Sequence, residues 1–283
     1  MPEFSTPQPI SVSVEVAGVR LGVRATAAAT TTVEVRPHNP GRPGDVALAG
    51  QIVVDYAAGR LTVRSPRPPR TGFRIVFGGN DRVDVDLELP AGSALEVRGW
   101  GDVTAHGRLG AVDIETGAGD ITLDRVEQLR AKTSAGNVRV SHAAAVAELR
   151  TAAGSVRVDR ADAELDAATA AGDVVVEAAT APLRLATSAG RVRVGRATTD
   201  VRANTSAGDI RLGSVAGGTV TAAAAFGGIE VGVAEGTAAW LDVQARLGAV
   251  RSDLESAGEP EPGEPTVRIH ATAGVGDIVL RRA

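Results

Sequence analysis

The chain of 283 residues contains no cysteine, which excludes disulfide bonds, thiolate catalysis and cysteine-ligated zinc. Aromatic residues make up only 2% of the sequence, whereas hydrophobic residues of all kinds make up 43%. A core built from this composition must therefore be aliphatic. Sites that bind sugars usually need aromatic platforms, so the scarcity of aromatic side chains also argues against a carbohydrate-active enzyme.

The chain also lacks a strong charge and a long apolar run. Its net charge of −4 and isoelectric point of about 5.7 argue against a binder of nucleic acid or of polyanions in general. No apolar run approaches the roughly 20 residues of a membrane-spanning helix. The first residues, M-P-E-F-S-T-P-Q-P-I, have neither the basic nor the apolar region of a secretory leader, so we expect a cytoplasmic protein.

What the sequence does have is a regularly recurring glycine. Successive members are roughly 18 residues apart through the middle of the chain, and such a fixed period predicts a solenoid. The ten positions are Gly101, Gly119, Gly136, Gly154, Gly172, Gly190, Gly208, Gly227, Gly248 and Gly276.

Apolar and polar residues alternate on both sides of each glycine. In one unit Val174 and Val176 follow Gly172, while Leu165, Ala167 and Thr169 precede it. Alternation with a period of two predicts short, half-buried strands, with a glycine of positive φ at the corner between them. We expect the polar residue after the glycine to bond its own backbone and hold the bend. The sequence thus predicts an all-β chain that forms a single parallel β-helix, or β-solenoid, with coils of about 18 residues and an irregular N-terminal part.

Four segments are predicted along the chain. Residues 1–98 form irregular β coils that also serve as an N-terminal cap, and residues 99–251 form the regular repeats. Residues 252–265 are an acidic, proline-rich surface loop, and residues 266–283 form a closing coil. Within the first segment, the breaker-rich stretches 36–45 and 64–72 are predicted to be loops or hairpin connections, and Phe73, Ile75 and Phe77 alternate as a strand would.

The repeat T-S-A-G-D-[VI]-x-[VL], the opening M-P-E-F-S-T-P, the segment A-A-W-L-D-V-Q-A-R-L-G-A-V-R-S-D-L (238–254) and the terminal G-D-I-V-L resemble a bacterial family of β-strand-repeat proteins. That family is catalogued as a domain of unknown function or "putative adhesin". The resemblance covers essentially the whole chain and implies a parallel β-helix. It implies no established activity and no catalytic residues.

Three sets of residues could bind a ligand, and each also has a purely structural interpretation. The first is a row of outward-facing arginines, which could bind phosphate, sulfate or carboxylate groups of an anionic polymer, although neighbouring carboxylates could neutralise it instead. The row consists of Arg139, Arg157, Arg193 and Arg211, interrupted by Val175.

The second set is Asp84, Asp86 and Glu88, which alternate on one strand face and could hold calcium or act as acid and base. An exposed polar strand face is the simpler interpretation. The third set is a ladder of inward-facing threonines, which could form a hydroxyl array for ice or glycans, or could bond the backbone at each corner. The ladder consists of Thr116, Thr133, Thr151, Thr169, Thr187 and Thr205.

These observations favour a non-catalytic β-solenoid scaffold or binding module whose partner is an unidentified protein or anionic polymer. The alternative is a cytoplasmic β-helix filament that assembles with itself, and a polysaccharide lyase or hydrolase ranks third because it rests on fold analogy alone. The histidines His38, His106, His142 and His270 form no ligand pair in the sequence. We therefore expect no catalytic residues, no cofactor and no metal site.

Overall fold

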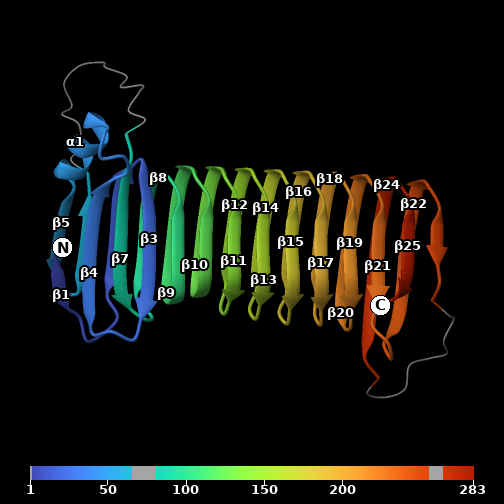
Figure 1. Ribbon diagram of the computed structural model, residues 1–283. Helices are drawn as coiled ribbons and strands as arrows, with labels where there is room; N and C mark the ends of the chain where they lie inside the picture. The colour runs from blue at the N-terminus through green and yellow to red at the C-terminus, as the bar shows by residue number, and fades with distance from the viewer. Residues whose placement is uncertain (1, 66–80, 255–263) are drawn as a thin grey trace. The chain divides into compact units, whose positions relative to one another are not determined.

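A computed structural model describes residues 2–65, 81–254 and 264–283. The predicted strand at residues 73–77, most of the predicted loop 64–72 and most of the predicted surface loop 252–265 lie outside these ranges. The described residues form strands and one helix, arranged in two compact units, Met1–Gly136 and Asn137–Ala283 (Figure 1). The predicted all-β fold class, a parallel β-solenoid, is confirmed.

The described residues of the first unit form ten strands and the helix. Its elements are β1 (Glu3–Ser5), β2 (Ser11–Ala17), β3 (Val19–Thr26), β4 (Thr30–Pro37), α1 (Pro43–Gln51), β5 (Val53–Ala57), β6 (Arg60–Arg64), β7 (Val83–Pro90), β8 (Ala94–Trp100), β9 (Val103–Ala118) and β10 (Ile121–Ala135).

Most neighbouring strands of the first unit are parallel, as a coiled path requires. β2 pairs in parallel with β6 on one side and with β8 on the other, and β3 pairs in the same way with β7 and β9. The antiparallel pairs are β5–β6, β4–β7 and β1–β4. Antiparallel strands therefore cover parallel coils in this unit, and such covering protects a sheet edge from further pairing.

The helix α1 corrects one prediction. Residues 36–45 were expected to form a loop because of their three prolines, yet helix α1 begins at Pro43. Proline is favoured in the first turn of a helix, where its missing N–H is not needed. Asp45 in that turn is 1% exposed and accepts hydrogen bonds from the backbone N–H groups of Asn39 and Arg82, each at 2.9 Å. These bonds tie the helix to the chain that enters β7.

The described residues of the second unit form strands and no helix. They are β11 (Val138–Ala143), β12 (Ala147–Ala153), β13 (Val156–Ala161), β14 (Leu165–Ala171), β15 (Val174–Ala179), β16 (Leu183–Ala189), β17 (Val192–Ala197), β18 (Val201–Ala207), β19 (Ile210–Val215), β20 (Gly218–Phe226), β21 (Ile229–Val233), β22 (Ala238–Leu247), β23 (Val250–Ser252), β24 (Thr266–Val275) and β25 (Ile278–Arg282).

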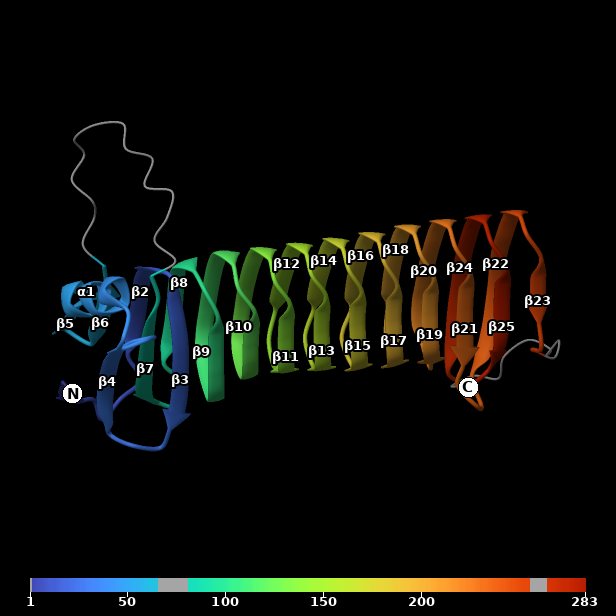
Figure 2. The same ribbon diagram turned by 45° about the horizontal axis from the view of Figure 1, so that its top comes forward.

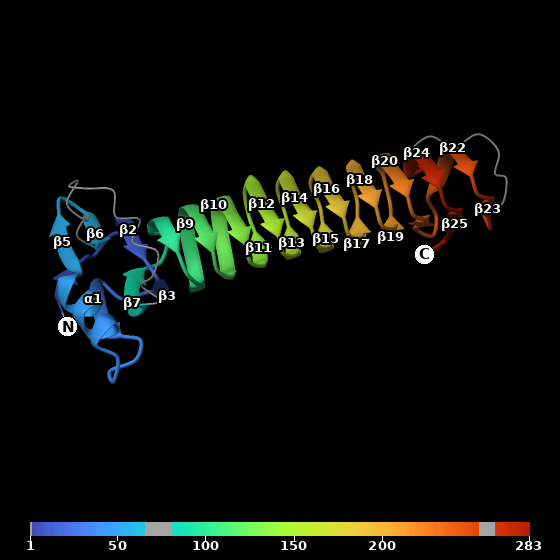
Figure 3. The same ribbon diagram turned by 90° about the horizontal axis from the view of Figure 1, so that it is seen from above.

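Each coil of this unit has one strand before the glycine corner and one after it, and the two sets of strands form two facing layers (Figure 3). The inward positions carry the aliphatic core: Val174, Val176, Leu165 and Ala167 are all 0% exposed. Corresponding positions of successive coils pair in register, as Leu165 with Leu183 and Val174 with Val192. Burial of each such side chain stabilises the fold by about 1.5–3 kcal/mol, less for alanine.

The corner glycines adopt the predicted positive φ. At Gly172 φ is +139°, and a Cβ built there would lie 2.2 Å from the carbonyl oxygen of Gly154 in the previous coil. The polar residue after the glycine differs from expectation, because it bonds a neighbouring coil rather than its own backbone. Asp173 accepts a hydrogen bond from the N–H of Arg191 at 2.8 Å. These side chains therefore link successive coils at the corner.

The order of the coils in space differs from their order in the sequence at the end of this unit. β24 pairs in parallel with both β20 and β22, and β25 pairs with both β21 and β23. The last coil of the chain therefore lies between two coils that precede it, as Figure 2 shows for β20, β24 and β22. β22 and β23 are left as the edge rung. The first unit has the same feature, because β2 lies between β6 and β8.

Candidate functional site

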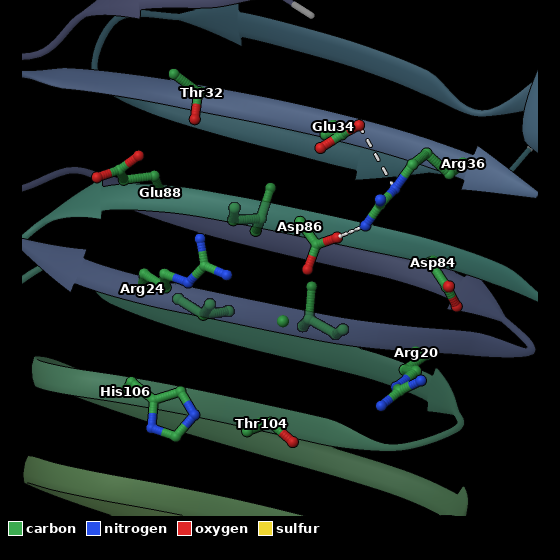
Figure 4. Close-up of a pocket in the computed structure, with 14 residues that line it drawn as sticks. Arg20, Arg24, Thr32, Glu34, Arg36, Asp84, Asp86, Glu88, Thr104 and His106 are labelled. Atoms are coloured by element: carbon green, nitrogen blue, oxygen red, sulfur yellow. Dashed lines mark hydrogen bonds and ion pairs between the residues drawn. The ribbon is translucent and has the colours of Figure 1, made fainter. Parts of the chain in front are cut away.

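The predicted acidic strand lies in a groove of about 440 Å³ on the outer face of β3, β4, β7 and β9 (Figure 4). Alternation along β7 buries Val85 and Leu87 and turns Asp84, Asp86 and Glu88 outward into this groove. The structure thus brings the three predicted carboxylates to one face.

Side chains of β4 and of the segment after it contact two of these carboxylates. Arg36 forms an ion pair with Asp86 and a second one with Glu34 at 3.5 Å. His38 contacts Asp84 through Nδ1 at 2.9 Å. In the described part of the chain, no cluster of three or more histidine, aspartate or glutamate residues is arranged to hold a metal ion.

The floor of this groove is Gly22 of β3, which lies between Asp86 and Thr104 in the register of the sheet. Arg20 and Arg24 flank the glycine and lie opposite Asp84 and Glu88 in register, although no ion pair closer than 4 Å joins them within the described residues. Cations and carboxylates therefore alternate across the groove. This arrangement presents no surface of a single sign to a charged ligand.

The predicted arginine row lies along the strands that follow the corners of the second unit. The register places Arg139 beside Arg157, then Val175, Arg193 and Arg211 in turn. Arg157 forms ion pairs with Asp159 at 3.1 Å and Glu177 at 2.8 Å. Glu230 accepts a hydrogen bond from Arg211 at 2.7 Å. Two of the four guanidinium groups are thus neutralised within the chain, which weakens the row as a binding surface for an anionic polymer.

Three of the four histidines pair with aspartates. They are His38 with Asp84, His142 with Asp162 and His270 with Asp242, at 2.9, 2.8 and 3.1 Å. Hydrogen bonds from Arg160 and then His142 lower the pKa of Asp162 to about 2. The carboxylate of Asp162 therefore stays ionised at neutral pH. Arg160 and His142 hold it in a local surface network of hydrogen bonds and ion pairs.

The inward-facing threonines bond the backbone, as their structural interpretation predicts. Thr169 donates to the carbonyl of Gly154 at 2.8 Å, and Thr205 donates to that of Gly190 at 3.1 Å. Both threonines are no more than 6% exposed. Because these hydroxyls lie inside the coils, they are not available as an array for ice or glycans.

The second unit exposes a cluster of apolar side chains that the sequence analysis did not identify. Phe226, Val275 and Leu247 are 65%, 42% and 68% exposed and lie side by side in register on β20, β24 and β22. We call these three residues the apolar row. Large contiguous apolar patches are rare on soluble proteins unless they bind something.

The apolar row borders a groove of about 840 Å³ on the outer face of β14, β16, β18, β20 and β24. The outward residues of these strands that line the groove are small and uncharged, and Arg246 of β22 is the one charged residue in the lining. They are Ala168, Ala186, Ser188, Asn204, Ser206, Ala223, Ala225, Thr272 and Gly274. An uncharged band is unusual in a chain with 23% charged residues.

A signal for the apolar row was present in the sequence. The residue before the corner glycine is alanine at Ala171, Ala189 and Ala207, but it is Phe226 in the next unit and then Leu247 and Val275. The change from alanine to large apolar side chains occurs at positions that the repeat itself predicts to be exposed. Comparison of the units position by position would have revealed it.

Comparison with known proteins gives one family model and several solved structures that match the chain. A family model described as Toastrack DUF4097 matches residues 12–280. Among solved structures, a "putative adhesin" from Bacteroides fragilis is 12% identical, with a TM-score of 0.39 over 99% of this chain and 95% of that one. A "putative cell adhesion protein" from Clostridium sporogenes is 10% identical, with a TM-score of 0.18 over 99% of this chain and 94% of that one. No curated protein sequence matches the chain.

Proposed function

Because the chain belongs to the Toastrack DUF4097 family, a family of β-strand repeats without an assigned activity, we propose that it is a non-catalytic β-solenoid scaffold that binds a partner protein. The apolar row of Phe226, Val275 and Leu247 carries this proposal. The partner contributes an extended, uncharged peptide segment that lies along the groove beside the row.

The chemistry of the groove supports this kind of partner. The burial of apolar surface favours association by about 25 cal/mol per Å², and the exposed ring of Phe226 is the largest side chain of the apolar row. The lining hydroxyl and amide groups of Ser188, Ser206 and Asn204 can bond a peptide backbone. A charged segment would have only Arg246 as a counter-ion, so an uncharged segment fits better.

The charged groove in the first unit supports the non-catalytic part of the proposal. General acid–base catalysis needs a group whose pKa is matched to its task and whose proton is free to move. Asp86 and Asp84 are instead held by Arg36 and His38. The lyase or hydrolase interpretation therefore has no specific observation in its favour.

A display library of random peptides tests the proposed function. The immobilised wild-type protein should enrich extended, uncharged peptides with apolar side chains. A selected peptide should bind Phe226→Ser at least about tenfold more weakly, since the variant removes the main apolar contact. Val146, which is 61% exposed outside the row, provides the matched control, and Val146→Ser should bind like the wild type. No enrichment, or equal binding by all three proteins, would contradict the proposal.

A further inference from the structure

The edge rung formed by β22 and β23 leaves the end of the solenoid core open. Leu241 occupies the position that Leu165 and Leu183 occupy in other coils, but it is 41% exposed where they are 0% and 1% exposed. Trp240 and Val250 on the same rung are 58% and 45% exposed. Among the described residues, β22 pairs with β24 alone, so no further coil covers these side chains.

The backbone of β22 is open as well. The N–H of Ala238 donates to the carbonyl of Pro265 at 2.9 Å, on the side of β24. Because successive peptide groups of a strand point to opposite sides, the N–H groups of Leu241, Val243 and Ala245 point to the free edge. The strand runs over ten residues, Ala238–Leu247, without a proline or a lysine. Proteins usually protect an exposed edge with such residues or with a covering segment.

We propose that a second copy of this chain pairs with the free edge of β22 in antiparallel orientation, across a twofold axis at Gln244. In this register Asp242 of each copy lies opposite Arg246 of the other, so that two ion pairs of opposite charge form. Val243 of each copy lies opposite Ala245 of the other. The inference goes beyond the proposed function, although Leu247 belongs both to the apolar row and to this rung.

Charge complementarity selects this register over its neighbours. An axis at Asp242 would place the two Asp242 carboxylates opposite each other, and an axis at Val243 would leave Asp242 opposite Gln244. Only the axis at Gln244 brings Asp242 to Arg246. The Asp242 side chain is 80% exposed despite its contact with His270, and within the described residues Arg246 has no ion-pair partner. Directly opposed charges of opposite sign stabilise strand pairing, and like charges destabilise it.

A twofold arrangement also explains why assembly would end at two copies. An isologous contact uses the same patch on both chains and leaves no free copy of that patch. In the first unit, the antiparallel strands β5, β4 and β1 cover the parallel coils. A filament would need a head-to-tail contact between two different surfaces.

Sedimentation velocity over a range of protein concentrations tests the proposal with a charge exchange. The wild type should form a dimer. Asp242→Arg and Arg246→Asp should each weaken it at least about tenfold, because each places two like charges opposite each other. The double variant D242R/R246D should restore the dimer, since opposite charges again face one another. Arg268→Asp, on the adjacent strand β24, is the control and should leave the dimer unchanged.

A second measurement does not depend on charge. Val243→Pro removes an N–H group that points to the free edge and retains those that bond β24, so it should weaken the dimer with little loss of melting temperature. The emission of Trp240, followed in a Trp100→Phe background, should shift with concentration in the wild type and not in Val243→Pro.

Three outcomes would overturn the inference: a monomer at every concentration, a double variant that stays monomeric, or polymers larger than the dimer. The last outcome would favour the filament alternative. Peptide binding separates this inference from the proposed function, because it should depend on Phe226 even in the monomeric Asp242→Arg variant. A monomer that binds peptide contradicts only the dimer, and a dimer that binds none contradicts only the peptide-binding function.

Discussion

The hydroxyl of Thr187 donates a hydrogen bond of 2.9 Å to the carbonyl oxygen of Gly172, the corner glycine of the preceding coil. Gly190 packs against the same oxygen, since a Cβ at Gly190 would lie 2.0 Å from it. At each corner, the absence of a side chain on the glycine leaves room for a carbonyl oxygen of the preceding coil. A threonine hydroxyl donates a hydrogen bond to that same oxygen. This pairing recurs at Thr169 and Thr205 and explains why the repeat requires both residue types.

Replacement of Thr187 by valine should destabilise the protein by about 1–2 kcal/mol, because a buried carbonyl loses its donor while the shape is preserved. Thr187→Ser retains the hydroxyl and should cost less. Ser188→Ala, at the outward neighbour, should change stability by less than about 0.5 kcal/mol. Chemical denaturation of the three variants measures these differences. Equal stabilities of Thr187→Val and wild type would show that the hydrogen bond has no structural role.

A side chain at Gly172 should be far more harmful than one at Gly117. The φ of Gly172 is +139°, and an added Cβ would lie 2.2 Å from a backbone oxygen, so Gly172→Ala should destabilise the protein by about 3 kcal/mol or more. Gly117 has no atom within 4 Å of an added Cβ, and Gly117→Ala should be neutral or slightly stabilising. Melting temperatures that fall equally in the two variants would contradict the corner assignment.

Asp166 illustrates how a position that looks neutral in the sequence can be engaged in the fold. Its outward place on β14 predicts that Asp166→Ala would have almost no effect. In the structure Arg150 donates to both carboxylate oxygens of Asp166, at 3.0 and 2.6 Å. The contacts of such a residue depend on the register between coils and not on the local sequence pattern. Gly117 is therefore a better control position than Asp166 for the effect of Gly172→Ala.

The Asp162 carboxylate makes stability depend on pH in a defined window. Hydrogen bonds from Arg160 and His142 lower the pKa of Asp162 to about 2, whereas an unfolded aspartate titrates near pH ~3.9. The ionised group therefore stabilises the fold above about pH 4, and this contribution is lost as the pH falls toward 2. Asp162→Asn should melt below the wild type at pH 5, and the difference should narrow toward pH 2. Glu235→Gln, at an exposed site, serves as the control.

A pH-independent difference between Asp162→Asn and the wild type would show that the aspartate acts through its shape and not through its charge.

The corner glycines, the threonine ladder and the alternating core could be predicted because each belongs to a coil that repeats its neighbour. The spatial order of β20, β24 and β22, in which the last strand in the sequence lies between the other two, could not be predicted. Ala222, Ala271 and Val243 occupy equivalent inward positions, so the pattern is satisfied whichever strand lies between the other two. The choice depends on contacts between segments far apart in the chain. The same limit applies to Asp173, which bonds the next coil where local sequence suggested its own backbone.

Incubation with polygalacturonate, alginate or bacterial cell-wall polysaccharide should release no reducing ends and no unsaturated products. The carboxylates of Asp84 and Asp86, the strongest acid–base candidates in the sequence, are engaged by His38 and Arg36. Product formation that disappears in Asp84→Ala or Asp86→Ala would show that the outer face of β7 is catalytic.

Hydrogen–deuterium exchange with a selected uncharged peptide bound tests the proposed binding surface most directly, because it separates the two grooves in one experiment. We predict slower exchange in β20 and β24, which carry Phe226 and Val275, and unchanged exchange in β3 and β7. Protection confined to β3 and β7 would place the partner in the charged groove of the first unit instead, and it would contradict the assignment of the apolar row as the binding surface.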